Sequence, residues 1–157
     1  MNLLVVGSVA LDSIETPFGK VDDVLGGSAL YFSVAASLLT GVRAIGVVGD
    51  DYPMDQLQAL SARGIDLSGV AQAPGESFRW RGKYSFDLAS RETLETRLGV
   101  FADFRPRIPA AFRDTPFVFL GNIHPDLQLA VLDQMRAPQL VACDTMNFWI
   151  EGAREAL

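Results

Sequence analysis

The fold is decided by the stretch Val6-Gly7-Ser8-Val9-Ala10-Leu11-Asp12 and by the later segment Gly26-Gly27-Ser28. The first ends an apolar strand in a carboxylate, and the second opens a helix with two adjacent glycines. Asp12 can accept hydrogen bonds from two hydroxyls, and glycines let the backbone and the positive end of a helix approach a ligand closely. The pattern therefore predicts a binding site for a polyhydroxylated ligand.

The composition favours one α/β domain that acts on a small molecule. The chain has 157 residues, of which 49% are hydrophobic, which is enough to bury a core. Its net charge is −6 and its Lys and Arg residues are scattered, which disfavours a nucleic-acid or membrane partner. No apolar stretch has the length of a signal peptide or a membrane span, so we expect a cytoplasmic protein.

Few residues are candidates for a metal site. Cys143 lies in an apolar run and is predicted to be a reduced core thiol, and with His124 alone it cannot form a zinc site. Asp50 and Asp51 are predicted to cap a following helix, and Asp22-Asp23 to be a solvated hairpin edge. The sequence therefore predicts no metal site in this chain.

Apolar runs and helical patterns alternate over most of the chain. Continuous apolar runs predict buried parallel strands, and apolar residues at helical spacing predict the helices between them. The expected strands are residues 2–9, 42–48, 117–120 and 139–143. The expected helices are residues 28–40, 53–64 and 125–135, with a last helical start from Glu151.

Two further segments alternate apolar and polar residues, which is typical of strands with one wet face. Residues 12–25 read as a hairpin, and residues 76–100 as strands 78–86 and 93–100. Together they predict one small antiparallel sheet that projects from the main domain. Phe78, Trp80 and Tyr84 share one face of it. We expect Trp80, Phe86 and Trp149 to pack on a sheet, with a role as stacking platforms for a ligand as the alternative.

These motifs resemble the N-terminal half of the ribokinase-like, or PfkB-type, sugar and nucleoside kinases. The resemblance implies that Asp12 holds sugar hydroxyls, that the Gly26-Gly27 amides face the substrate, and that Gly49-Asp50-Asp51 forms a turn typical of the family. Gly64-Ile65-Asp66 resembles a short link that follows. Asp144-Thr145-Met146-Asn147 resembles a segment whose asparagine lies near the transferred phosphate.

The resemblance also implies a fold and a cofactor. The fold is a truncated three-layer α/β/α arrangement, with a mostly parallel central sheet and a small antiparallel β lid formed by segments 12–25 and 76–100. ATP and Mg²⁺ are implied, but their binding residues and the catalytic base belong to a C-terminal half that residues 1–157 do not contain. The lid often mediates dimerisation, so a homodimer of the intact protein is expected.

Some residues depart from the family pattern or leave alternatives open. Tyr31 stands where family members often carry an asparagine, and its ring can stack on a sugar or a base. Asn122 is the better candidate for a sugar contact at the carboxyl edge of the sheet, while His124 is expected to cap a helix or face solvent. Asn147 either caps the final helix or lies near phosphate.

Two other functions are alternatives to the acceptor-binding half of an ATP-dependent kinase. A stand-alone sugar-binding module without catalysis would use the same acceptor residues. A small dehydrogenase-like domain is disfavoured because no dinucleotide fingerprint and no phosphate-binding loop is present. In the kinase interpretation the catalytic residues lie outside the chain, so residues 1–157 by themselves are expected to transfer no phosphate.

Overall fold

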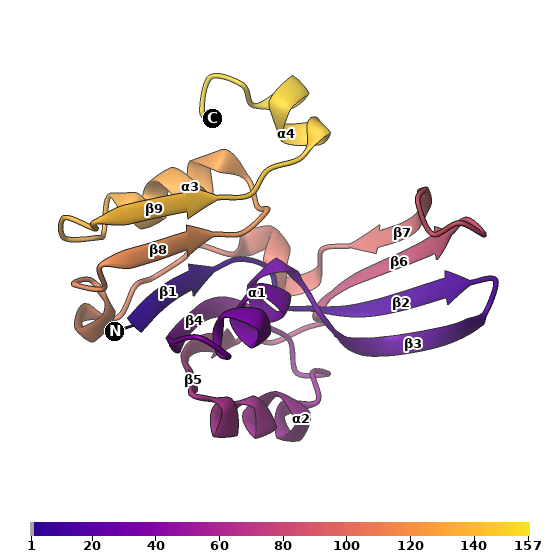
Figure 1. Ribbon diagram of the computed structural model, residues 1–157, viewed down its shortest axis with the longest axis horizontal. Coiled ribbons are helices and arrows are strands. Elements are labelled where there is room, and N and C mark those ends of the chain that lie inside the picture. The colour runs from indigo at the N-terminus through magenta and orange to yellow at the C-terminus, as the bar shows by residue number, and fades with distance from the viewer. Residues whose placement is uncertain (1) are drawn as a thin grey trace.

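A computed structural model describes residues 2–157 as two sheets in one chain (Figure 1). The main sheet has the strand order β5-β4-β1-β8-β9, and the smaller sheet, called the lid below, has the order β3-β2-β6-β7. The strands of the main sheet are β1 (Asn2–Val6), β4 (Gly41–Val48), β5 (Ile65–Gln72), β8 (Phe117–Leu120) and β9 (Leu140–Cys143). The strands of the lid are β2 (Ala10–Thr16), β3 (Gly19–Gly26), β6 (Phe78–Tyr84) and β7 (Arg91–Arg97). The lid projects from the edge at which the main strands end (Figure 1).

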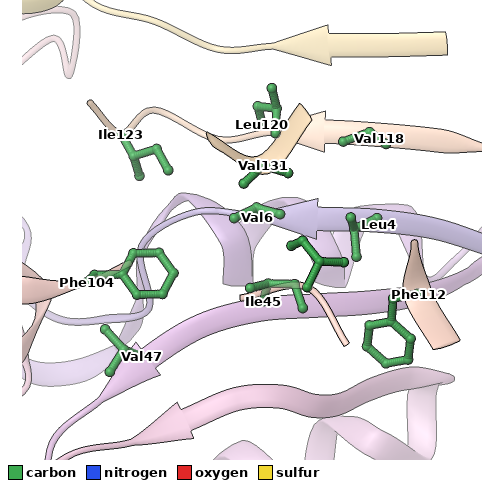
Figure 2. Packing of buried hydrophobic residues seen from close by; sticks show 11 residues of the cluster. Leu4, Val6, Ile45, Val47, Phe104, Phe112, Val118, Leu120, Ile123 and Val131 are labelled. Atoms are coloured by element: carbon green, nitrogen blue, oxygen red, sulfur yellow. The ribbon is translucent and has the colours of Figure 1, made fainter. Parts of the chain in front are cut away.

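The main sheet is parallel throughout, with β1 at its centre. Leu4, Val5 and Val6 are fully buried, and because successive side chains of a strand point to opposite faces, they enter two different cores. Figure 2 shows Leu4 and Val6 between Val118 of β8 and Ile45 of β4. The predicted central strand is thus confirmed, and it ends at Val6.

Helical segments cover both faces of the main sheet. Residues of α1 and α2 pack on the face of Val5, whereas α3 and the segment around Phe104 and Phe112 pack on the face of Leu4. The α-helices are α1 (Ser28–Ala36), α2 (Met54–Ala59), α3 (Pro125–Leu132) and α4 (Asn147–Gly152). Short 3₁₀ helices are η1 (Leu60–Arg63), η2 (Gly99–Asp103) and η3 (Ala110–Phe112). The three-layer α/β/α architecture predicted from the sequence is confirmed.

The lid forms from the two predicted segments but is not purely antiparallel. The hairpins β2–β3 and β6–β7 are antiparallel, whereas β2 and β6, which join them, run parallel. The expectation of an antiparallel lid was wrong on this point because alternation of polar and apolar residues reports a half-wet strand and not the direction of its neighbour. The two-faced character is confirmed: Asp12, Trp80 and Thr96 are register partners on one face, and Arg81 and Glu95 are partners on the other.

Three expected element boundaries were wrong. Residues 64–66 were expected to be a link, but Ile65 begins β5, an edge strand whose polar residues and Gly69 hide the strand pattern. Gly69 is needed there because a Cβ would collide with the Ile45 side chain at a register shift between β4 and β5. Helix α1 ends at Ala36, and the last helix begins at Asn147 rather than Glu151.

The β9 edge is much less covered than the sheet centre. Cys143 is exposed at the end of β9, so the prediction of a core thiol was wrong. The apolar run that suggested burial belongs to an edge strand with all four residues exposed. Other large apolar residues of the same region are exposed as well, namely Leu140, Val141, Met146, Phe148 and Ile150.

Candidate functional site: a buried carboxylate beneath the lid

Asp12 is buried at the point where the chain passes from the main sheet into the lid. Its side chain is 9% exposed, and it lies against the backbone of Gly26 so closely that a Cβ at Gly26 would collide with the carboxylate. Gly27 has a φ of 97° and a Cβ there would collide with the Ser8 carbonyl. Both glycines are therefore required by the close approach of the residues before α1 to Asp12 and Ser8. Their predicted approach to a ligand stays a prediction.

The environment of Asp12 disfavours its charge. Burial raises the pKa of the Asp12 carboxyl above its ordinary value of 3.8, and a hydrogen bond from the Gly27 amide partly offsets that rise. Within residues 2–157 no side chain donates a hydrogen bond to this carboxylate. Asp12 is thus a buried acceptor with capacity left for donors that the fold itself does not supply.

Ser28 holds the glycine turn in place. Its amide donates to Ser8 Oγ at 3.0 Å, its Oγ accepts from the Ser8 amide at 3.2 Å, and the two hydroxyl oxygens lie 3.1 Å apart. These bonds tie the beginning of α1 to the residues that follow β1. The predicted site residue Ser28 is therefore close to Asp12 in the fold, with its hydroxyl engaged by Ser8.

Aromatic residues surround the carboxylate. Tyr31 of α1 is 56% exposed, and the pKa of its hydroxyl is raised by burial, by the charge of Asp12 and by that of Tyr84 from the lid. Trp80 is the register partner of Asp12 on β6, so the two side chains leave the lid on the same face. Asp12, the diglycine and Tyr31 are thus brought together as the sequence predicted.

Tyr52 is a neighbour that sequence reasoning missed. It is buried after the turn that follows β4, its hydroxyl donates to the Ala10 carbonyl at 3.3 Å, and burial with the charge of Asp12 raises its pKa. Its position just after the Asp50-Asp51 turn, which follows the strand next to β1, was the available signal. An aromatic residue there lies at the same sheet edge as Asp12.

Asn122 and Asn147 lie further along the same edge, at β8 and β9. Asn122 Oδ1 accepts from Trp149 Nε1 at 2.9 Å, and the Trp149 ring meets the His124 ring edge-on at 4.9 Å between centroids. The Asp126 amide donates a hydrogen bond to His124 Nδ1 at 3.2 Å, so His124 caps α3, as expected. Trp149 therefore packs on the beginning of α3 and not on a sheet.

Asn147 is the first residue of α4 and is exposed, with Met146 at the capping position and no side-chain capping bond. The helix-capping alternative for Asn147 is therefore wrong. The sheet order places β9 two strands from β1, so Asn147 does not join the Asp12 cluster directly. Its place near a transferred phosphate stays a prediction.

The Asp50-Asp51 turn does not cap α2. Helix α2 has Pro53 at its capping position without a side-chain bond, and the Asp51 carboxylate instead accepts from Ser77 and Arg79. Asp23 likewise pairs with Arg79. The helix-cap prediction was wrong because the partners of Asp51 are more than twenty residues away in sequence. The prediction of a solvated hairpin edge is confirmed, since Asp22 and Asp23 are exposed on the edge strand β3.

The described residues 2–157 contain no group of three or more His, Cys, Asp or Glu side chains placed to hold a metal ion. In the same range no helix is long and apolar enough to cross a membrane.

Comparisons with known proteins agree with this fold. No family model matches the chain. A cytidine kinase of Thermococcus kodakarensis is 28% identical over 141 residues, which are 89% of this chain and 50% of that protein. This chain therefore spans about half the length of the curated relative that it matches.

Solved structures show the same fold. A Burkholderia thailandensis nucleoside kinase in complex with inosine superimposes with a TM-score of 0.69 at 19% identity, over 84% of this chain and 47% of that one. A ribokinase from Thermotoga maritima gives a TM-score of 0.67 at 18% identity, over 90% and 52%. The resemblance to the N-terminal half of ribokinase-like kinases, expected from the motifs, is confirmed by these likenesses in sequence and fold.

Proposed function

Because the chain has a ribokinase-like fold and spans about half the length of its relatives, we propose that it forms the acceptor-binding, N-terminal half of a PfkB-type, ATP-dependent kinase that phosphorylates a hydroxyl group. The observation that carries the proposal is the Asp12 carboxylate, which is buried beside Gly26 and Gly27 and hydrogen-bonded only by a backbone amide. A folded protein rarely leaves a buried carboxylate so poorly compensated unless a ligand completes it.

Vicinal hydroxyls of a sugar ring are suitable hydrogen-bond donors for the Asp12 carboxylate. Each can donate a charge-assisted hydrogen bond to Asp12, worth about 1.5 to 3 kcal/mol. Such a pair of bonds fixes the ring in one orientation and so directs its remaining primary hydroxyl away from Asp12. In this account the chain's own contribution to phosphate transfer is to bind and orient the acceptor.

A nucleoside is the acceptor that the site favours, with a simple sugar as the second candidate. Tyr31 offers a half-exposed ring next to Asp12, and Trp80 lies on the same face of the lid, so a flat base has aromatic surfaces to stack against. The cytidine kinase relative supports this choice. The likeness to a ribokinase supports the sugar.

The lid is proposed to exclude water from the acceptor. Its face toward Asp12 carries Ile14, Val24 and Trp80, while its opposite face carries ion pairs such as that of Lys83 Nζ with Glu15 Oε1 at 2.8 Å. An apolar face over the acceptor would limit hydrolysis of ATP by water. ATP would supply the phosphoryl group. The ligands of Mg²⁺ and the catalytic base would be residues beyond those described.

The same apolar face can pair two subunits, and we propose a homodimer of the intact protein through the lid. Light scattering of a Trp80→Glu variant should show a shift toward monomer. The control is Arg81→Glu on the opposite face, which should leave the mass unchanged. An unchanged mass for Trp80→Glu would place the interface elsewhere.

Kinetics test the proposed function. ADP release is measured over a panel of nucleosides and sugars, with the 157-residue chain and with the intact protein. We expect acceptor-dependent turnover from the intact protein and none from residues 1–157 alone. Asp12→Ala should weaken acceptor use at least about tenfold with the KM for ATP nearly unchanged.

Equal losses for ATP and acceptor would contradict the assignment of Asp12. Binding of an acceptor by the intact protein without any ADP release would instead favour the stand-alone binding module. Turnover by the 157-residue chain above a heat-inactivated control would overturn the proposal that residues 1–157 bind the acceptor without catalysing phosphate transfer.

A further inference from the structure

Arg79 is the one lid arginine that joins three separate segments among the described residues. Its Nη1 pairs with Asp23 Oδ1 of β3 at 2.5 Å, and its Nη2 pairs with Asp51 Oδ2 of the turn after β4 at 2.6 Å. The Arg79 side chain is only 18% exposed. The guanidinium therefore links the β2–β3 hairpin, β6 and the main domain at once.

The turn after β4 is also hydrogen-bonded to the residues that precede β6. Ser77, which is fully buried, donates to Asp51 Oδ1 from its amide at 2.8 Å and from its hydroxyl at 2.7 Å, and its Oγ accepts from the Gly49 amide at 2.9 Å. Gly75 and Asp50 exchange two further bonds, from the Asp50 amide to the Gly75 carbonyl at 2.9 Å and from the Gly75 amide to Asp50 Oδ2 at 3.2 Å.

The exit of the β6–β7 hairpin is tied to the same place. The Val100 amide donates to the Glu76 carbonyl at 2.8 Å. Gly99 has a φ of 50° and lies so close to Glu76 that a Cβ would collide with the Glu76 carbonyl. The residues that enter and leave the hairpin are thus hydrogen-bonded to each other, and Asp51 of the main domain binds the adjacent Ser77.

A local irregularity of β3 delivers the second carboxylate. Asp12 pairs with Val24 and Ile14 with Val21, so Asp22 and Asp23 bulge from the ladder, and Asp23 takes a φ of 51°. The Asp23 amide donates to Ser13 Oγ at 3.1 Å, which keeps the bulge folded. The bulge is what lets Asp23 face Arg79.

We propose that Asp51, Arg79 and Asp23 form an anchor that fixes the tilt of the lid on the main sheet and thereby positions Trp80 over Asp12. Arg79 and Trp80 are adjacent on β6 and point to opposite faces, so fixing Arg79 on one face sets where the Trp80 ring lies on the other. Asp51 and Arg79 are thus positioning residues for acceptor binding. They touch neither the acceptor nor Asp12.

Arg81 provides a matched control on the same strand and face. Its guanidinium pairs with Asp22 Oδ1 at 3.3 Å, and both partners belong to the lid. Loss of that pair removes one lid arginine without cutting a link between the lid and the main domain. A general effect of lost charge would appear in both arginine variants, whereas loss of the anchor appears in one.

The experiment measures the lid orientation directly. Spin labels are attached at Gln58→Cys on α2 and Glu92→Cys on β7, both exposed positions, in the intact protein with Cys143→Ser and any other reactive cysteine replaced. Pulsed electron–electron double resonance then gives the distribution of distances between the labels. We expect one narrow peak for the parent and for Arg81→Ala, and a broadened distribution for Arg79→Ala and Asp51→Asn.

Arg79→Lys keeps the charge but cannot hold two carboxylates with one planar group, so it should broaden the distribution as well. It carries the test if Arg79→Ala does not fold. Unchanged distributions for Asp51→Asn and Arg79→Lys would overturn the anchor. Equal broadening by Arg81→Ala would also overturn it, because the effect would then lie in lid charge alone.

The consequence for the acceptor rests on the proposed function. The anchor variants should raise the acceptor KM by about tenfold, with the KM for ATP nearly unchanged, since a misplaced lid wall weakens acceptor positioning. Broadened distances in a protein that phosphorylates nothing would leave the anchor standing and remove the proposed function. Unchanged distances and an unchanged acceptor KM in an active kinase would overturn the anchor and leave the proposed function standing.

Discussion

The main sheet and the lid are stabilised by different means. In the main sheet β1 is covered by apolar side chains on both faces, and its neighbours β4 and β8 run parallel to it. In the lid, one face is charged and the edge strand β7 is exposed along its whole length. The base of the lid contacts the main domain through the ion pairs of Arg79 and through Phe78, whose ring stacks on Phe101. Burial therefore stabilises the main sheet, whereas ion pairs add to a small apolar contact at the base of the lid.

This difference suits a binding site at the junction. Asp12 stands where the rigid sheet meets the more lightly held lid, so one side of the site is set by packing and the other by a few ion pairs and hydrogen bonds. Loss of these contacts should therefore change the position of the lid with little rearrangement of apolar surface.

The largest effect is expected in the core of the main sheet. Leu4→Ala removes a fully buried side chain and should lower the free energy of unfolding by about 2 to 5 kcal/mol. Leu94→Ala in the lid removes a side chain that is 45% exposed and should change it by about 0.5 kcal/mol or less. Urea denaturation followed by circular dichroism checks both. Similar losses for the two variants would mean that the lid is as tightly packed as the main sheet.

Asp12→Asn should separate binding from stability. The raised pKa of Asp12 means that its ionised form is disfavoured in the folded chain, so removal of the charge should increase the urea midpoint at neutral pH. The gain should shrink as the pH falls through the folded pKa toward 3.8, because Asp12 itself then becomes neutral. A lower urea midpoint for Asp12→Asn at pH 7 would contradict this description of the site.

Acid should loosen the lid before it unfolds the main sheet. Partial burial opposes ionisation of Asp51, but hydrogen bonds from Ser77 and the charge of Arg79 prevail and lower its pKa below 3.8. Its contribution is therefore complete above 3.8 and is lost as the pH falls through the lower folded value. Hydrogen exchange of the Ser77 amide, corrected for the intrinsic pH dependence, should accelerate in that acid range. In Asp51→Asn this acid-specific acceleration should be absent, and its persistence would assign the loosening to another group.

The smallest effect is expected from an isolated surface ion pair. Arg136 Nη1 lies 3.2 Å from Asp114 Oδ2, and both side chains are 65% exposed. Exposed pairs of this kind contribute little because solvent screens them. Arg136→Ala should leave the urea midpoint within error of the parent, and a clear loss would show that surface pairs matter more here than the comparison assumes.

The regular parts of the fold were predictable from the sequence, and the contacts between distant segments were not. Continuous apolar runs located β1, β4 and β8, and alternation located the lid, because both patterns report burial of a strand. The edge strand β5 was missed because Asp66, Ser68 and Gly69 interrupt its pattern. The parallel pairing of β2 with β6 depends on how two hairpins meet, which no local pattern encodes.

The candidate site divides in the same way. Asp12 and the diglycine were predictable because a close backbone approach demands glycine. Asp51 was read as a helix cap, since its actual partners Ser77 and Arg79 lie on a segment that only the tertiary fold brings near. Cys143 was placed in a core because an edge strand with apolar residues looks like a central one in sequence.

The central claim is that the Asp12 carboxylate holds ligand hydroxyls, and calorimetric titration of the intact protein tests it most directly. Cytidine and 2′,3′-dideoxycytidine are titrated into the parent and into Asp12→Asn. The account predicts that the parent binds cytidine at least about tenfold more tightly than the dideoxy compound, and that Asp12→Asn loses most of this preference. Equal hydroxyl preference in the parent and in Asp12→Asn would contradict it.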